Sequence, residues 1–322
     1  MKTRVVEARH ARIELVDEGE GPVVLLVHGF PESWYSWRHQ IPALVEAGYR
    51  AVAIHVRGYG RSSSPLEVDA YSMLQHVSDN LGVLEALGVE RCAVVGHDWG
   101  SPIAAHSALL RPDAFAAVAL LSVPFSPPGG RRPTDAFAQM GAAFGEEFYI
   151  NYFQEPGRAE AEIELDVRSW LRGFYVAASG DGGPAPDGKT VAFVRPGGML
   201  RERFPVVEKL PSWLTEEDLD FYVGLFEHTG FRGPLNRYRN VDRDWLDLQP
   251  WRNRPITVPA LFIGGEKDGP TIWGARSLER HPVTMPGIQG SHILPGCGHW
   301  VQQERPEDVN RILLEWLEPL SW

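Results

Sequence analysis

The sequence predicts an α/β fold, in which helices cover a mostly parallel β-sheet and a helical segment is inserted late in the chain. Through Leu121, apolar runs of strand type alternate with helical stretches. This alternation is typical of parallel strands joined by right-handed crossovers. The pattern is lost after Pro124 and returns at Val258, which indicates that the segment between them is an insertion into the sheet domain.

The composition is that of a globular protein and disfavours two classes of partner. The 322 residues are 43% hydrophobic, enough for a large core. The net charge of −11, with no basic cluster, argues against nucleic acid and anionic membranes. Residues 1–17 lack the apolar core of a signal peptide, and no apolar run approaches the roughly 20 residues of a membrane helix. Cys92 and Cys297 are far apart, which fits the reducing cytoplasm, where we expect the protein.

The first part of the fold, residues 1–127, opens with edge strands and continues as strands and helices in alternation. Weak alternation from Val5 to Val16 indicates the edge strands, and the apolar run Pro22–Val27 indicates a strand buried on both faces. The elements expected next are a helix at Trp37–Ala47, a strand at Arg50–Ile54, a helix at Leu74–Leu87 ended by Gly88, a strand at Arg91–Val95, a helix at Ile103–Leu110 and a strand at Phe115–Leu121.

A helical cap is expected at residues 128–250, and the sheet domain resumes at residues 251–322. The Pro- and Gly-rich stretch Pro127–Pro133 reads as a linker into the cap. Cap helices are expected at Asp135–Phe144, Glu146–Phe153, Glu160–Tyr175 and Glu216–His228. The resumed sheet domain is expected to hold strands at Val258–Ile263 and Ser291–Leu294 and a helix at Glu307–Leu317, with Pro306 near its first turn.

The sequence Gly96-His97-Asp98-Trp99-Gly100 has the form of a nucleophile elbow, a tight turn from a strand into a helix. Glycine suits both ends of the turn because a Cβ atom would crowd it. The residue at the tip is Asp98, where esterases and lipases have serine. A carboxylate that attacks a saturated carbon forms an ester, which water can cleave, whereas a serine would form a stable ether. Asp98 therefore indicates displacement at a saturated carbon followed by ester hydrolysis, and it excludes a serine-type esterase or lipase.

Two further residues complete a triad with Asp98. Asp268 follows an apolar strand, and His299 lies in a glycine-bounded loop after another strand. The chain order Asp98, Asp268, His299 is that of nucleophile, acid and histidine in α/β hydrolases. The carboxyl ends of parallel strands meet at one edge of the sheet, so we expect the three side chains to meet there. His299 is expected to activate water, and Asp268 is expected to orient His299.

A resemblance to a known family is carried by the stretches His28–Arg38, Arg57–Ser62, Gly96–Gly100, Tyr152–Gly157, Gly230–Asn240 and Gly298–Trp300. Nearly end to end, the chain resembles the soluble epoxide hydrolases of the α/β-hydrolase superfamily. The resemblance implies an α/β-hydrolase fold with an inserted helical cap, and conversion of an epoxide and water to a vicinal diol. It also implies that Tyr152 and Tyr238 of the cap activate the epoxide oxygen, whereas Tyr149 is expected only to line the pocket.

The loop after the first buried strand is expected to form the oxyanion hole, since it contains glycine and follows a central strand. The backbone N–H groups of Phe30 and Trp99 are the expected donors, and Phe30, Trp99 and Trp300 are the expected pocket residues. We expect no metal ion or other cofactor, and a small hydrophobic epoxide as the substrate. The sequence is also compatible with a homodimer.

Two residues depart from the family pattern: His55 replaces an aspartate, and Arg237 stands where a large aromatic residue is common. Arg237 therefore bears on the shape of the pocket. A haloalkane dehalogenase with the same Asp-His-Asp triad is the alternative enzyme, but that family has asparagine at the position of Phe30 and lacks the paired cap tyrosines. A binding protein without turnover is a further alternative, although such proteins usually lose a triad member and none is lost here.

Overall fold

An eight-stranded sheet forms the centre of the protein in a computed structural model that describes residues 1–182, 187 and 190–322. The strand order is β1-β2-β4-β3-β5-β6-β9-β10. The β1–β2 and β2–β4 pairs are antiparallel and the others are parallel. The strands are β1 (Thr3–Ala8), β2 (Ala11–Glu18), β3 (Val23–Val27), β4 (Arg50–Ile54), β5 (Cys92–His97), β6 (Phe115–Leu121), β9 (Ala260–Gly265) and β10 (Ile288–Leu294).

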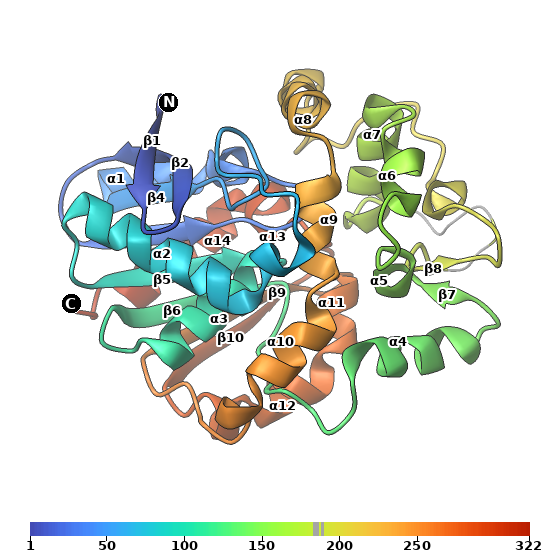
Figure 1. The fold of residues 1–322 in the computed structure, drawn as a ribbon. Coiled ribbons are helices and arrows are strands. Elements are labelled where there is room, and N and C mark those ends of the chain that lie inside the picture. The colour runs from blue at the N-terminus through green and yellow to red at the C-terminus, as the bar shows by residue number, and fades with distance from the viewer. Residues whose placement is uncertain (183–186, 188–189) are drawn as a thin grey trace.

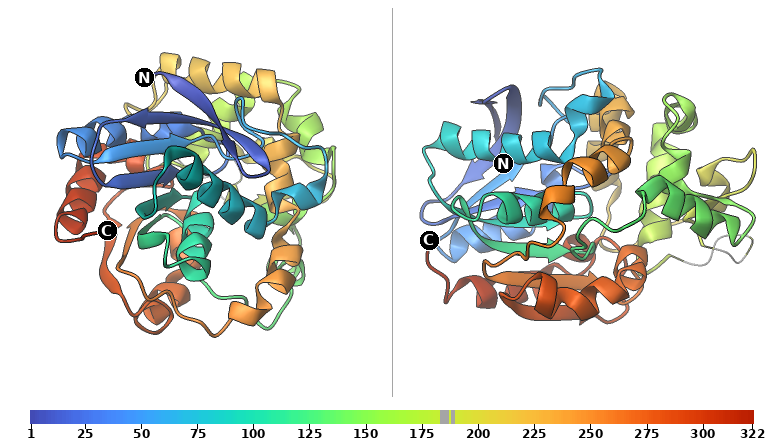
Figure 2. Two further views of the ribbon diagram at one scale, coloured as in Figure 1. Left: turned by 60° about the vertical axis from the view of Figure 1, so that its left-hand side comes forward. Right: turned by 60° about the horizontal axis from the view of Figure 1, so that its bottom comes forward.

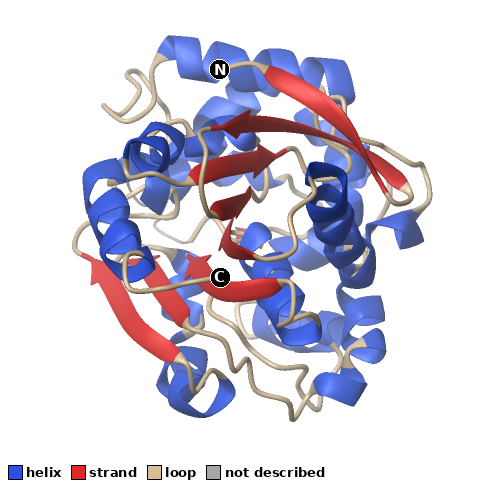
Figure 3. Ribbon diagram, turned by 90° about the vertical axis from the view of Figure 1, so that its left-hand side faces the viewer, coloured by secondary structure: helices blue, strands red, loops and turns tan. Residues whose placement is uncertain are grey.

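Helices cover both faces of this sheet (Figure 3). Side chains alternate between the two faces of a strand. In β3, Leu25 belongs to the apolar cluster that includes α2 and α3, while Leu26 belongs to the cluster that includes α1 and α14. The helices of the sheet domain are α1 (Gln40–Glu46), α2 (Met73–Leu87), α3 (Gly100–Leu110), α11 (Gly269–Trp273), α12 (Ala275–Thr284), α13 (Val301–Glu304) and α14 (Pro306–Leu317), with 3₁₀ turns η1 (Trp34–Trp37), η2 (Val68–Tyr71) and η4 (Gln249–Trp251).

Between β6 and β9, residues 133–247 form a mostly helical segment, which we call the cap. Its helices α5 to α7 lie on the side of the molecule opposite the two termini (Figures 1 and 2). Its elements are α4 (Pro133–Ala142), β7 (Glu147–Phe148), α5 (Tyr149–Tyr152), α6 (Arg158–Ile163), α7 (Val167–Ala178), β8 (Phe193–Val194), η3 (Leu200–Arg203), α8 (Glu216–Thr229), α9 (Arg232–Tyr238) and α10 (Val241–Asp247).

The predicted fold class is confirmed, and the differences from the sequence-based expectation lie mainly in the cap. The helix expected at Glu160–Tyr175 is two helices, because the Asp166 side chain accepts a hydrogen bond from the Ser169 N–H (2.9 Å) and caps a new helix there. The helix expected at Glu146–Phe153 is the short strand β7 followed by α5. Helices α9 and α10 of the cap and helices α11 and α12 of the sheet domain were not predicted.

The carboxyl ends of the parallel strands face the cap. The loops after β3, β5 and β9 provide Phe30, Asp98 and Asp268, which share one cavity with the cap residues Phe174 and Tyr238. In the part of the chain that the structure describes, no helix has the length and apolar character needed to cross a bilayer.

Candidate active site

Asp98 lies at the tip of a sharp turn between β5 and α3. Its backbone has a φ of 50°, in the left-handed region that non-glycine residues rarely adopt. The flanking glycines permit the close approach of the two elements: a Cβ atom on Gly96 would lie 1.9 Å from the Gly100 carbonyl oxygen, and one on Gly100 would lie 1.9 Å from the Val27 carbonyl oxygen. The turn is therefore a nucleophile elbow, and both glycines are needed for it.

The two oxygens of the Asp98 carboxylate have different environments. Oδ1 accepts a hydrogen bond from the Phe30 backbone N–H at 2.7 Å, the donor expected for the oxyanion hole. Oδ2 lies 3.5 Å from Nε2 of His299. One oxygen is thus fixed by the loop after β3, while the other faces the histidine. The corresponding role of the Trp99 N–H stays a prediction.

His299 is held against Asp268, as the chain order predicted. Its Nδ1 lies 2.9 Å from Oδ1 of Asp268. Burial alone would lower the pKa of His299, but the carboxylates of Asp268 and Asp98 outweigh it and raise that pKa above its usual value. The three side chains therefore form one hydrogen-bonded and charged unit.

Two hydroxyl groups that were not predicted hold Asp268. Ser122 Oγ and Thr271 Oγ1 both donate to Oδ2 of Asp268, at 2.7 and 2.6 Å. Ser122 directly follows β6 and has a φ of 71°. Its position directly after a parallel strand is the same signal that located Asp268, and it could have identified Ser122. Among the described residues, no group of three or more His, Cys, Asp or Glu side chains is arranged to hold a metal ion.

The structure does not bring Tyr152 to Asp98, where its predicted role would place it, and it brings Tyr149 there instead. The Tyr152 hydroxyl donates to Glu162 at 2.5 Å inside the cap, and Tyr152 lines neither cavity beside Asp98. Tyr149 lines both of these cavities, and Tyr238 lines one of them. The rings of Tyr149 and Tyr238 are 6.1 Å apart.

Trp300, expected in the pocket, lines neither of the cavities beside Asp98. Its side chain is fully buried, and its indole N–H donates to the Tyr175 carbonyl at 2.8 Å. It therefore packs between the cap and the loop of His299 rather than facing a substrate. The two other predicted pocket residues, Phe30 and Trp99, do line the cavities beside Asp98.

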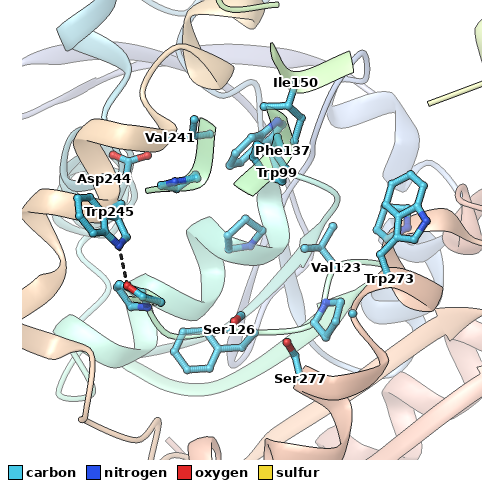
Figure 4. A pocket seen from close by; sticks show the side chains of 18 of the residues that line it. Trp99, Val123, Ser126, Phe137, Ile150, Val241, Asp244, Trp245, Trp273 and Ser277 are labelled. Carbon is cyan, nitrogen blue, oxygen red and sulfur yellow. Dashed lines mark hydrogen bonds between the residues drawn. The ribbon is translucent and has the colours of Figure 1, made fainter. Parts of the chain in front are cut away.

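Two cavities meet at Asp98. The larger has a volume of about 480 Å³ and the smaller about 260 Å³. Asp98 and Tyr149 line both, together with Pro270 and Trp273. Figure 4 shows the larger cavity, whose wall combines the cap residues Phe137, Ile150, Val241 and Trp245 with Trp99, Val123, Trp273 and Ser277. We call these the larger and the smaller chamber.

Each residue that departs from the family pattern has a charged partner. Nδ1 of His55 lies 3.0 Å from the Glu14 carboxylate. Arg237 is buried, pairs with Asp244 of α10 and lies over the ring of Trp99, 4.7 Å from its centroid. Arg237 thus forms part of the larger chamber's wall and fixes one face of Trp99.

The comparisons with known proteins agree with this geometry. A family model described as the alpha/beta hydrolase fold matches residues 22–306, which places the chain in the α/β-hydrolase superfamily. Epoxide hydrolase B of Mycobacterium tuberculosis is 45% identical to it, across 98% of this chain and 97% of the relative. Epoxide hydrolase A of the same species is 43% identical, across 99% of this chain and 98% of the relative. The solved structure of an epoxide hydrolase from an endophytic Streptomyces is 61% identical and superposes with a TM-score of 0.96, across 98% and 95% of the two chains. The chain therefore belongs to the epoxide hydrolase family.

Proposed function

We propose that this enzyme converts an epoxide and water to a vicinal diol through a covalent ester on Asp98. The observation that carries the proposal is the Asp98 carboxylate itself, with Oδ1 on the Phe30 N–H and Oδ2 facing His299. The names of the relatives support an epoxide rather than a haloalkane as substrate. The complete hydrogen-bonded triad favours turnover over binding alone.

In the first step, Oδ2 of Asp98 attacks a carbon of the epoxide ring. A new carbon–oxygen bond forms, the ring bond from that carbon to the epoxide oxygen breaks, and the electron pair goes to the oxygen. The developing alkoxide needs a proton donor, because it is otherwise a poor leaving group. The positions of Tyr149 and Tyr238 on the wall of the smaller chamber, beside Asp98, support them as the donors.

The electrostatic environment suits both tyrosines to this role. Burial, reinforced by the charge of Asp98, raises the pKa of Tyr149 and of Tyr238 above the usual value. Both hydroxyls therefore carry their protons at neutral pH and can donate hydrogen bonds to the epoxide oxygen. A donor aimed at the atom where charge develops stabilises the transition state more than the ground state.

In the second step, water cleaves the ester. His299 takes a proton from the water, and the water oxygen attacks the ester carbonyl carbon. The Phe30 N–H stabilises the resulting oxyanion at Oδ1. The bond between the carboxyl carbon of Asp98 and Oδ2 then breaks, and His299 returns its proton to the departing Oδ2. The diol leaves with Oδ2, while the carboxylate of Asp98 keeps the water oxygen. Ester formation also removes the charge of Asp98. Since that charge helps to raise the pKa of His299, its loss lowers this pKa and favours the neutral imidazole, which can accept a proton from water.

The two chambers favour a substrate with apolar groups on both sides of the epoxide. Asp98 and Tyr149 lie where the chambers meet, so an epoxide held there would extend one substituent into each. The difference in volume, about 480 against 260 Å³, suits substituents of unequal size. Walls rich in aromatic and aliphatic side chains suit a hydrophobic substrate.

The proposal is tested by trapping the ester. His299→Gln should block the second step but not the first, so intact mass spectrometry should show protein plus one substrate molecule. His292→Gln, in an exposed part of β10, is the matched control and should turn over like the wild type. No mass increase on H299Q with an epoxide that the wild type hydrolyses would contradict the covalent route, and reaction with a bromoalkane alone would favour the dehalogenase.

A further inference from the structure

The end of cap helix α7 is hydrogen-bonded directly to the loop that carries His299. The backbone N–H of His299 donates to the Ala178 carbonyl at 2.9 Å. Two residues later, the Gly180 N–H donates to Glu304 at 2.8 Å, and the Gly180 carbonyl accepts from Nζ of Lys267 at 2.8 Å. The cap is thus joined to the sheet domain beside both Asp268 and His299.

Glu304 holds the histidine loop as well as the cap. Its Oε2 accepts from the Gly298 N–H at 2.9 Å, and its Oε1 accepts from the Trp300 N–H at 3.0 Å. These donors flank His299 in the sequence. One partly buried carboxylate therefore binds the backbone on both sides of the base and, through Gly180, the end of α7.

At this junction the two backbone segments lie so close together that position 180 has no room for a side chain. A Cβ atom on Gly180 would lie 2.1 Å from the Gly296 carbonyl oxygen and 3.0 Å from Glu304 Oε2. Ala177 and Ala178, just before it, line the smaller chamber together with His299. The same short segment thus contacts the space for the substrate, the base and Glu304.

We propose that Glu304 is a positioning residue for ester hydrolysis, which holds His299 in place by joining its loop to Gly180 of the cap. The inference rests on the proposed function. The attack of Asp98 on an epoxide does not use His299 as a base, whereas cleavage of the ester does. A loosened junction therefore slows the second step and leaves the first step nearly unchanged.

Two substitutions test the junction from its two sides. Glu304→Gln replaces one acceptor oxygen with an NH₂ group, which would face backbone N–H groups. Gly180→Ala pushes the two segments apart without substituting any residue of the histidine loop. Glu266→Gln is the control for the first, since Glu266 accepts from Gly296 in the same loop on the solvent side (2.8 Å). Gly224→Ala on α8, where no atom lies within 4 Å of an added Cβ, is the control for the second.

The measurement is a rapid-quench single turnover that follows both the ester on Asp98 and the diol, after thermal unfolding has established that each variant is folded. E304Q and G180A should slow ester hydrolysis by roughly 10²-fold, the cost of a base displaced by about 1 Å, so that ester accumulates. Alkylation should stay near the wild-type rate, and both controls should match the wild type. A purely structural role would lower the stability of the variants without separating the two steps.

The outcomes distinguish this inference from the proposed function. If His299→Gln forms the ester in the same experiment but E304Q and G180A do not accumulate it, only the role of Glu304 is wrong. If H299Q forms no ester, the covalent mechanism itself fails. Equal slowing of both steps in E304Q and G180A also overturns the inference, and G180A decides the matter if E304Q does not fold.

Discussion

At the scale of single residues, the charge of Asp98 and the protonation of His299 are coupled across 3.5 Å. The carboxylates of Asp98 and Asp268 together raise the pKa of His299 against the effect of burial. Asp98→Asn removes one of these charges and resembles the neutral ester. The pKa of His299 should therefore be lower in D98N than in the wild type, as followed by NMR titration of its ring protons. An unchanged or higher value would show that Asp98 does not set the protonation of the base.

The tyrosines provide a second prediction, in which a neighbouring tyrosine serves as the control. Tyr149→Phe and Tyr238→Phe should each slow alkylation of Asp98 by ~10²–10³-fold, the usual cost of losing one donor to a developing oxyanion. Tyr152→Phe should leave alkylation nearly unchanged. It should instead destabilise the fold by roughly 1–3 kcal/mol, because the buried Glu162 loses a hydrogen-bond donor. Pre-steady-state alkylation and chemical denaturation measure the two effects.

A reversed result, with Tyr152→Phe slow in alkylation and Tyr149→Phe normal, would restore the sequence-based assignment. The sequence could not choose between these tyrosines, since residues three apart lie on neighbouring positions of a helix face. The choice depends on Glu162, which accepts from Tyr152, Trp170, Leu200 and Arg201. Three of these donors are distant in sequence from Tyr152, so no local pattern reports the cluster.

At the scale of elements, the pair of Arg237 and Asp244 fixes α9 and α10 against the sheet domain. Arg237 also donates to the Tyr71 carbonyl, and Asp244 accepts from the Met73 N–H at the start of α2 (2.6 Å). Tyr238, next to Arg237, is thereby placed over the site. The departure from the family pattern at Arg237 is thus explained by a buried ion pair that joins cap to core.

Arg237→Met should lower the free energy of unfolding by about 3–5 kcal/mol, because it leaves the Asp244 carboxylate buried without its partner. The double variant R237M/D244N should recover much of this loss, since no unpaired charge remains. Denaturant unfolding of the wild type and both variants makes the comparison. A loss below about 1 kcal/mol in R237M would place the pair among weak surface interactions.

At the scale of the whole molecule, the sequence predicted the features that depend on local periodicity. Apolar runs located the parallel strands, and the rule that strand ends converge at one edge brought Asp98, Asp268 and His299 together. The positions of Tyr152 and Trp300 and the helices α9 and α10 were missed because they depend on contacts between residues that are distant in sequence. The two chambers arise from these contacts, and so does the junction at Glu304.

The central claim is that water cleaves an ester on Asp98 and does not attack the epoxide directly. A single turnover with enzyme in excess, in heavy-oxygen water, tests it most directly. Because water attacks the carbonyl carbon of the ester, heavy oxygen should appear in the peptide that contains Asp98, and the diol should carry none. Heavy oxygen in the first diol released, with an unlabelled Asp98, would contradict the account.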